Sequence, residues 1–152
     1  MKHGAKSLMV WGAIKIGGSW TIIRCPNILN SMEFQNVLRS GLLPFYDSRN
    51  IFQQDGAPCH TVASTIAFLE DHGVCLLSDM PAQSPDINII ECLWSELKSE
   101  VARKKSTSID DLWTTCKEAW VAIPTVSIKT IYQSITRWLK EVIQKKGSNT
   151  SY

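Results

Sequence analysis

Two acidic residues stand in sequence surroundings that could hold a divalent metal ion. Asp55 directly follows the strand-like run 51–54, and Glu91 lies in the first turn of a helix predicted to begin after Asn88. Carboxylate oxygens are ligands that Mg²⁺ and Mn²⁺ prefer, and ions held this way activate a nucleophile and stabilise the leaving oxygen in phosphoryl transfer. The pair therefore indicates a candidate metal-dependent phosphoryl-transfer site.

Each acid also has a purely structural interpretation. Asn88 can cap the predicted helix, and Glu91 then occupies the third helical position, where acidic side chains are common. Asp55 precedes Gly56, a pairing typical of the turn after a strand. Local sequence alone favours these structural roles, so a catalytic interpretation depends on longer motifs around both acids.

The chain is predicted to begin with a hairpin and a helix. Residues 7–25 contain two β-rich runs around the turn at 17–18, and their nearly continuous apolar pattern predicts cover on both faces of the sheet. A helix is expected from Ser31, its predicted N-cap, to about Leu43. Its predicted inner face consists of Phe34, Val37, Leu38 and Leu42.

A strand–helix–strand unit is predicted next. Strand 51–54 leads to Asp55, a helix begins at Pro58 and stops near Gly73, and residues 74–77 form another short buried strand. Connections of this size predict that the two strands are parallel. The predicted inner face of the helix consists of Val62, Ile66 and Leu69.

Three amphipathic helices are predicted to complete the chain. The first covers about 89–104, the second runs from the capping box at 108–111 to Pro124, and the third follows Pro124. Apolar residues at helical spacing are predicted to face inward. In chain order these are Ile90, Trp94, Leu97 and Val101; Ile109, Leu112, Cys116 and Trp120; and Ile128, Ile131, Ile135, Trp138 and Val142.

The composition is that of one ordinary globular domain. The 152 residues are 44% hydrophobic and 20% charged, with a net charge of +2 and no apolar run long enough to span a bilayer. The five cysteines are odd in number and form no C-x-x-C pair, so we expect free thiols in a reducing compartment. A zinc site is the alternative, but its ligands would include adjacent residues in an awkward geometry: Cys59, His60, His72 and Cys75.

Long motifs around both acids carry a family resemblance. Residues 53–61 read QQDGAPCHT, residues 81–94 read PAQSPDINIIECLW, and residues 2–12 read KHGAKSLMVWG. Together these stretches resemble the Tc1/mariner-type DDE transposases over about residues 2–120. The resemblance implies an α/β, RNase H-like fold, in which a mixed sheet is flanked by helices and followed by a helical C-terminal portion.

The resemblance also implies roles for six residues. Asp55 and Glu91 correspond to the second and third catalytic acids, which bind Mg²⁺ or Mn²⁺ in a two-metal site. Four more residues are expected to position these acids or to contact substrate phosphate, namely His60, Asn88, Gln83 and Ser84. The implied partner is DNA at transposon ends, the implied reaction is DNA cleavage and strand transfer, and the implied location is the nucleus.

The first acid of the implied triad is expected before Met1, on a strand that this chain lacks. Upstream of Asp55 the acids are Glu33, in a predicted helix, and Asp47, in a predicted loop, so neither is expected to replace it. Ile89 also stands where the family usually has proline, and the separation of the two acids is slightly long. We therefore expect a catalytic domain truncated at its N-terminus, spanning 1–146 with a disordered tail at 147–152, and inactive alone.

The missing strand leaves three structural outcomes open. In the family fold it lies between the hairpin and the strand that ends at Asp55. The hairpin could pair directly with 51–54, another chain could supply a strand, or the exposed edges could leave the chain marginal and prone to aggregate.

An alternative function is non-catalytic binding of nucleic acid or assembly with transposase, either full-length transposase or a second copy. It rests on a group of basic residues on the predicted helices. Ordinary solvent-exposed helix faces are an alternative explanation for these residues. The residues are Lys98, Arg103, Lys104 and Lys105, together with Lys129, Arg137 and Lys140.

Overall fold

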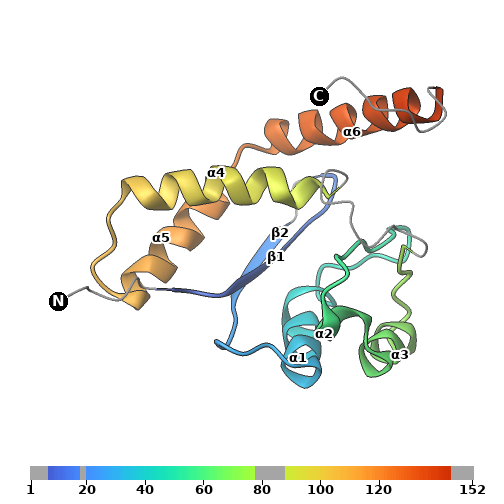
Figure 1. The fold of residues 1–152 in the computed structure, drawn as a ribbon, viewed down its shortest axis with the longest axis horizontal. Coiled ribbons are helices and arrows are strands. Elements are labelled where there is room, and N and C mark those ends of the chain that lie inside the picture. Colours follow the sequence, from blue (N-terminus) through green and yellow to red (C-terminus); the bar gives the residue numbers. More distant parts are fainter. Residues whose placement is uncertain (1–6, 18–19, 78–87, 145–152) are drawn as a thin grey trace.

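The computed structural model describes residues 7–17, 20–77 and 88–144 of the chain (Figure 1). Its architecture is mixed α/β, with one small antiparallel sheet and six helices in the described residues. The elements are β1 (Val10–Ile14), β2 (Trp20–Arg24), α1 (Ser31–Gly41), α2 (Pro58–Thr61), α3 (Ala63–Asp71), α4 (Ile89–Arg103), α5 (Ile109–Val121) and α6 (Thr125–Gln144).

The predicted hairpin is confirmed. β1 and β2 pair antiparallel in a register that places Val10 opposite Arg24 and Ile14 opposite Trp20. Gly17 lies in the connection with φ of 109°, a backbone conformation that glycine adopts without the steric penalty of a Cβ atom. The hairpin is the only multi-residue sheet in the part of the chain that the structure describes.

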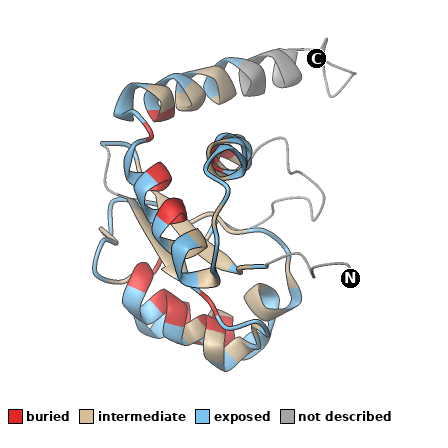
Figure 2. Ribbon diagram, turned by 90° about the vertical axis from the view of Figure 1, so that its left-hand side faces the viewer, coloured by how far each residue is buried: buried red, intermediate tan, exposed pale blue. Residues whose placement is uncertain are grey.

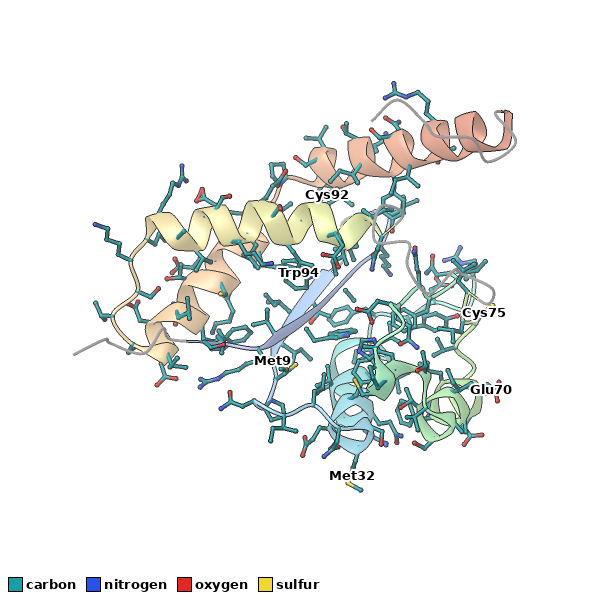
Figure 3. All side chains as sticks on the ribbon, in the orientation of Figure 1. Met9, Met32, Glu70, Cys75, Cys92 and Trp94 are labelled. Carbon is teal, nitrogen blue, oxygen red and sulfur yellow. The ribbon has the colours of Figure 1, made fainter. Side chains whose placement is uncertain are left out.

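Helices cover both faces of the hairpin, as the continuous apolar pattern predicts. α1 lies on one side, and α4 and α5 lie on the other (Figure 1). A Cβ atom at Gly41 of α1 would fall 2.6 Å from both Trp11 and Ile23, so the helix backbone rests directly on the strands. On the opposite face Gly12 meets Trp94 and Trp120, and Figure 3 shows Trp94 extending from α4 toward the hairpin.

The core divides into two clusters on opposite sides of the hairpin. One joins α1 to α3 and contains buried residues such as Phe34, Leu38 and Leu69. The other joins α4, α5 and α6 through Leu93 and Trp120, among others. Figure 2 shows the buried positions on the flanking helices, while β1 is of intermediate exposure throughout.

Helix α1 confirms the predicted inner face and corrects the predicted cap. Phe34, Val37 and Leu38 are buried in α1, and Leu42 is buried just beyond its end. The N-cap is Asn30 and not Ser31, because the Asn30 side chain accepts a hydrogen bond from the Glu33 N–H at 2.9 Å. Both residue types cap helices well, so the sequence left the start uncertain by one position.

The strand–helix–strand unit is confirmed in direction but reduced in extent. Phe52 and Leu76 form a single parallel bridge. In the described residues, 51–54 and 74–77 are not joined by a ladder of several residue pairs. The predicted single helix is divided, because Val62 has an extended backbone between α2 and α3. This break turns Val62 outward and leaves Ile66 half-buried, so the buried residues of α3 are Thr65, Phe68 and Leu69.

The last three helices match their predicted ranges, and two inner faces differ in detail. On α4 the buried positions are Ile89, Leu93 and Leu97, with the predicted Ile90, Trp94 and Val101 partly buried beside them. Leu97 is buried as predicted, and the other buried positions lie one residue before the predicted ones, because contacts with the hairpin, α5 and α6 together widen the apolar face of α4. On α5, Cys116 and Trp120 are buried as predicted, whereas Ile109 and Leu112 are half-buried.

Two further sequence predictions concern α5 and α6. Ser108 caps α5 by accepting the Asp111 N–H at 3.0 Å, which confirms the predicted cap. On α6, Ile128 is buried and Ile131 and Ile135 are half-buried, while the side chains of Trp138, Lys140 and Val142 lie outside the described residues. No helix among the described residues is both long and apolar enough to cross a membrane.

The hairpin does not pair directly with the segment that leads to Asp55. Among the described residues, β1 pairs with β2 and Phe52 pairs with Leu76, and no backbone hydrogen bond joins β1 to 51–54. The first of the three outcomes for the missing strand is therefore wrong. The tail at 147–152, predicted to be disordered, lies outside the described residues.

The contact of Gly12 with two tryptophan rings predicts a stability effect. A Cβ atom there would lie 2.9 Å from Trp94 and 3.0 Å from Trp120. Gly12→Val should lower the free energy of unfolding by about 1–3 kcal/mol. Because valine is favoured in strands, this loss is attributed to the packing clash. Urea denaturation measures it, and Ala102→Val on the exposed side of α4 should change stability by no more than about 0.5 kcal/mol. Equal losses in the two variants would contradict this packing.

Candidate active site

Asp55 is held at the end of the 51–54 segment by two local hydrogen bonds. Its Oδ1 accepts the backbone N–H of Ala57 at 3.1 Å, which closes the turn that precedes α2. The same oxygen lies 2.5 Å from Nδ1 of His60. The Asp55 side chain nevertheless remains 59% exposed, so the carboxylate can contact solvent or a ligand.

His60 connects Asp55 to the core beneath α1. Its ring stacks on Phe34 with centroids 4.0 Å apart, and its side chain is only 13% exposed. The Gln54 side-chain amide donates to the His60 carbonyl at 3.0 Å. The imidazole is thus fixed between a buried aromatic ring and the carboxylate, which limits the orientations that Asp55 can take.

Glu91 is positioned by the start of α4. Asn88 is the N-cap, with its side-chain Oδ1 accepting the Ile90 N–H at 3.4 Å and its carbonyl accepting the Glu91 N–H at 3.0 Å. Ile89 is buried, which anchors the first turn on the core. Glu91 is exposed, and no described residue forms a hydrogen bond or ion pair with its carboxylate.

One cleft brings these residues together. It has a volume of about 390 Å³ and lies between β1, the segment that ends at Asp55, and the start of α4. Its lining includes four of the six predicted site residues, which are Asp55, His60, Asn88 and Glu91. The other two, Gln83 and Ser84, lie outside the described residues.

The donor set of this cleft fits one hard divalent cation. Asp55 and Glu91 supply carboxylate oxygens, and Mg²⁺ is commonly held by one or two carboxylates together with water and substrate oxygens. No group of three or more His, Cys, Asp or Glu side chains gathers for a metal ion within the described residues. The described residues therefore offer oxygen ligands suited to Mg²⁺ or Mn²⁺, but fewer than two closely spaced ions require.

The structure does not bring the predicted basic residues to this cleft. Lys98, Arg103, Lys104 and Lys105 lie along or just beyond the second half of α4, whereas Glu91 lies in its first turn. At 1.5 Å per residue, Arg103 is about 18 Å along the helix axis from Glu91.

Ion pairs also reduce the positive charge of this set. Arg103 pairs with Glu100, and Lys104 Nζ lies 2.9 Å from Glu118 Oε2. The Arg103 guanidinium lowers the pKa of Glu100, and the Glu118 carboxylate raises the pKa of Lys104. All of these groups are solvated at the surface, so the pairs contribute little to stability.

Known proteins are similar to this chain in sequence. A family model described as DDE superfamily endonuclease matches residues 2–122, which include both acids and every residue that lines the cleft except Tyr132. The Tc1 transposase of Caenorhabditis elegans is 31% identical over all of this chain, and the Tcb2 transposase of Caenorhabditis briggsae is 32% identical over the same extent. The chain belongs to the Tc1-like DDE transposase family.

This Tc1-like chain matches only part of its relatives. It covers 57% of the Tc1 and Tcb2 transposases. The Tc3 transposase of Caenorhabditis elegans is 34% identical over 98% of this chain, which covers 47% of that protein. The chain thus spans about half the length of the curated relatives that it matches.

Sequence reasoning missed three residues that shape the cleft of the Tc1-like site. Gln54 adjoins Asp55 and holds the His60 backbone, Phe34 stacks on the His60 ring, and Tyr132 of α6 lines the cleft from a distant part of the chain. The position of Gln54 beside the acid could have identified it. No pattern in the sequence connects Phe34 or Tyr132 to the site, because both contacts arise from tertiary packing.

The cap at Asn88 predicts a measurable effect on α4, the helix that carries Glu91. Asn88→Ala removes the side-chain acceptor for the Ile90 N–H and should lower the free energy of unfolding by about 1 kcal/mol. Asn88→Ser retains a capping oxygen and should lie close to the parent in urea denaturation. If the Asn88→Ala and Asn88→Ser variants were equally stable, the side-chain cap at this position would contribute nothing to the start of this helix.

Proposed function

We propose that this chain forms part of a Tc1-like transposase catalytic domain with an RNase H-like fold, in which Asp55 and Glu91 bind Mg²⁺ or Mn²⁺ and act on DNA. The observation that carries the proposal is that the two acids come from separate elements and line one cleft. The family match covers the cleft residues other than Tyr132, and the relatives are named as transposases. DNA at transposon ends is the proposed substrate.

The six candidate site residues have distinct parts in this proposal. Asp55 and Glu91 hold the cation, which when bound supplies positive charge to a phosphodiester and lowers the pKa of a coordinated water. His60 fixes the orientation of the Asp55 carboxylate through the 2.5 Å contact, and its own ring is fixed by Phe34. Asn88 fixes the first turn of α4 and so directs Glu91 to the cleft. Gln83 and Ser84 are proposed to contact substrate phosphate.

The chain by itself is proposed to be inactive in DNA cleavage. Asp55 and Glu91 are the only carboxylates among the described residues that line the cleft. Two divalent ions a few ångströms apart repel one another strongly and need several negative ligands to hold them. Two carboxylates are therefore expected to bind one ion weakly. The attacking and leaving oxygens would then lack the pair of metal ions that stabilises both.

Metal binding and DNA cleavage together test this proposal. Calorimetric titration with Mn²⁺ should show weak binding by the purified chain, and Asp55→Ala or Glu91→Ala should each weaken it by at least about tenfold. Glu96→Gln, an exposed acid on the same helix, is the matched control and should leave binding unchanged. A supercoiled-plasmid nicking assay with Mg²⁺ or Mn²⁺ should detect no cleavage by the parent.

Each outcome bears on a different part of the proposal. Parent-like Mn²⁺ binding in both alanine variants would remove the two acids from the metal site. Nicking that is lost in both variants would overturn the proposed inactivity. Salt-sensitive DNA binding without Mn²⁺ binding would favour the alternative of a non-catalytic DNA-binding or assembly module, because phosphate contacts weaken steeply as salt rises.

The extent of the domain and its location complete the proposal. Residues 1–146 are proposed to form the catalytic unit, with 147–152 a disordered tail, and the nucleus is its proposed location because DNA is the proposed substrate. Deleting 147–152 should leave the urea midpoint unchanged, and a fluorescent fusion should accumulate in nuclei. A lower midpoint would assign the tail a structural role, and a fusion excluded from nuclei would contradict the location.

A further inference from the structure

Two backbone carbonyls near the end of α2 have no backbone donor. α2 has only four residues, and it ends at Val62, which has an extended backbone. In a continuous helix the carbonyls of Cys59 and His60 would accept the N–H groups four residues later. Among the described residues no backbone N–H donates to either carbonyl. Two side chains from other parts of the chain donate to them instead.

Thr65 donates to the first of these carbonyls from inside the core. Its side chain is fully buried, and its Oγ1 lies 2.8 Å from the Cys59 carbonyl oxygen. Thr65 belongs to α3, whose Phe68 is buried in the same core cluster as Phe34. α2 lies between α1 and α3 (Figure 1), so this bond ties the short helix to a packed neighbour.

Gln54 donates to the second carbonyl from the segment that leads to Asp55. Its Nε2 lies 3.0 Å from the His60 carbonyl oxygen, which can only accept, so the amide must present its nitrogen there. The Gln54 Oε1 is then buried, with no hydrogen-bond partner among the described residues. A buried oxygen without a partner lowers stability, so the stability of the fold does not by itself explain this amide.

These two bonds restrain the His60 ring through the backbone that carries it. The ring stacks on Phe34 with centroids 4.0 Å apart, and its Nδ1 lies 2.5 Å from Asp55 Oδ1. A rotation of α2 about its axis would carry the ring away from both partners. Hydrogen bonds to two consecutive carbonyls of α2, one from each of two other elements, oppose that rotation.

The two carboxylate oxygens of Asp55 differ in their surroundings. Oδ1 accepts the Ala57 N–H at 3.1 Å and also contacts His60 Nδ1. Oδ2 forms no hydrogen bond or ion pair with any other described residue. Carboxylates that bind metal ions are themselves held by hydrogen bonds, which orient the binding oxygen. The bonds to Oδ1 therefore leave Oδ2 open to a cation.

We propose that Thr65 and Gln54 are positioning residues, which hold the His60 ring against Asp55 Oδ1 and so direct Oδ2 to the cation. This inference rests on the proposed metal site and assigns its support to two residues that the family motifs did not single out. Neither side chain bonds to Asp55. Both act through the α2 backbone and the His60 ring.

A pair of substitutions at Thr65 tests the positioning role without a metal ion. Thr65→Val keeps the shape of the side chain and removes the hydroxyl, whereas Thr65→Ser keeps the hydroxyl. The readout is the NMR chemical shift of the His60 ring protons, which the ring current of Phe34 displaces. We expect Thr65→Val to move this resonance toward that of an unstacked histidine and Thr65→Ser to stay close to the parent.

A control and a second variant complete this test. Thr115 is also buried, on α5, and its hydroxyl accepts a hydrogen bond from Ser106 at 3.4 Å. Thr115→Val therefore makes the same change in the core at a distance from α2, and it should leave the His60 resonance unmoved. Gln54→Leu removes the donor to the His60 carbonyl and should move the resonance as Thr65→Val does. It also keeps the test open if Thr65→Val does not fold.

Mn²⁺ affinity, measured by electron paramagnetic resonance, tests the link to the cation. His60→Ala removes the contact with Asp55 and should weaken binding by about tenfold. Thr65→Val should weaken binding by no more than this, and Thr65→Ser should restore it. Because Thr65 acts through His60, adding Thr65→Val to His60→Ala should cause no further loss.

The possible results separate this inference from the proposed function. An unmoved His60 resonance in both Thr65→Val and Gln54→Leu would overturn the positioning role. A further loss of Mn²⁺ affinity in the double variant would also overturn it, because Thr65 would then act by another route. No Mn²⁺ binding by the parent would overturn the proposed metal site and the assignment of Asp55 Oδ2. The His60 resonance would still decide whether the two side chains hold the ring.

Discussion

The direct packing of aromatic rings on glycine backbone, on both faces of one hairpin, is the constraint on which the rest of the structure depends. Trp94 and Trp120 meet Gly12 from one side, and Gly41 rests on Trp11 from the other. The absence of a Cβ atom at both glycines lets each helical layer approach the strands closely. The two core clusters are therefore held at a fixed separation, although the sheet between them has only two strands.

This arrangement determines where the two acids lie. Trp94 and Glu91 are on the same helix, so the contact of Trp94 with the hairpin also places the first turn of α4. On the opposite side, α1 contributes Phe34, whose ring supports His60 and through it Asp55. Each carboxylate is thus tied to one of the helical layers that enclose the hairpin, and the cleft lies where the layers face each other.

The same architecture explains where the acid cleft lies. Helices cover both faces of the sheet, but no described strand fills the space between β1 and the 51–54 segment.

The sequence by itself determined the family and most of the helical elements, and it singled out Asp55 and Glu91 as candidate site residues. Long motifs specify Asp55 and Glu91, and the periodicity of apolar residues places α4 and α5 to within a few positions, because both signals are local. The sequence did not determine the break at Val62, the cap at Asn30 or the wider inner face of α4. Those depend on competition between neighbouring caps and on contacts with several elements at once.

Only the tertiary structure decided how the acids are supported and what surrounds them. Three contacts join residues far apart in the chain: His60 stacks on Phe34, Tyr132 lines the cleft, and Phe52 forms a parallel bridge with Leu76. The basic residues of α4 also lie far from Glu91, because they are near the opposite end of the same rigid helix. Motifs and helical periodicity depend on residues close together in the sequence, whereas contacts between distant segments form only when the chain packs.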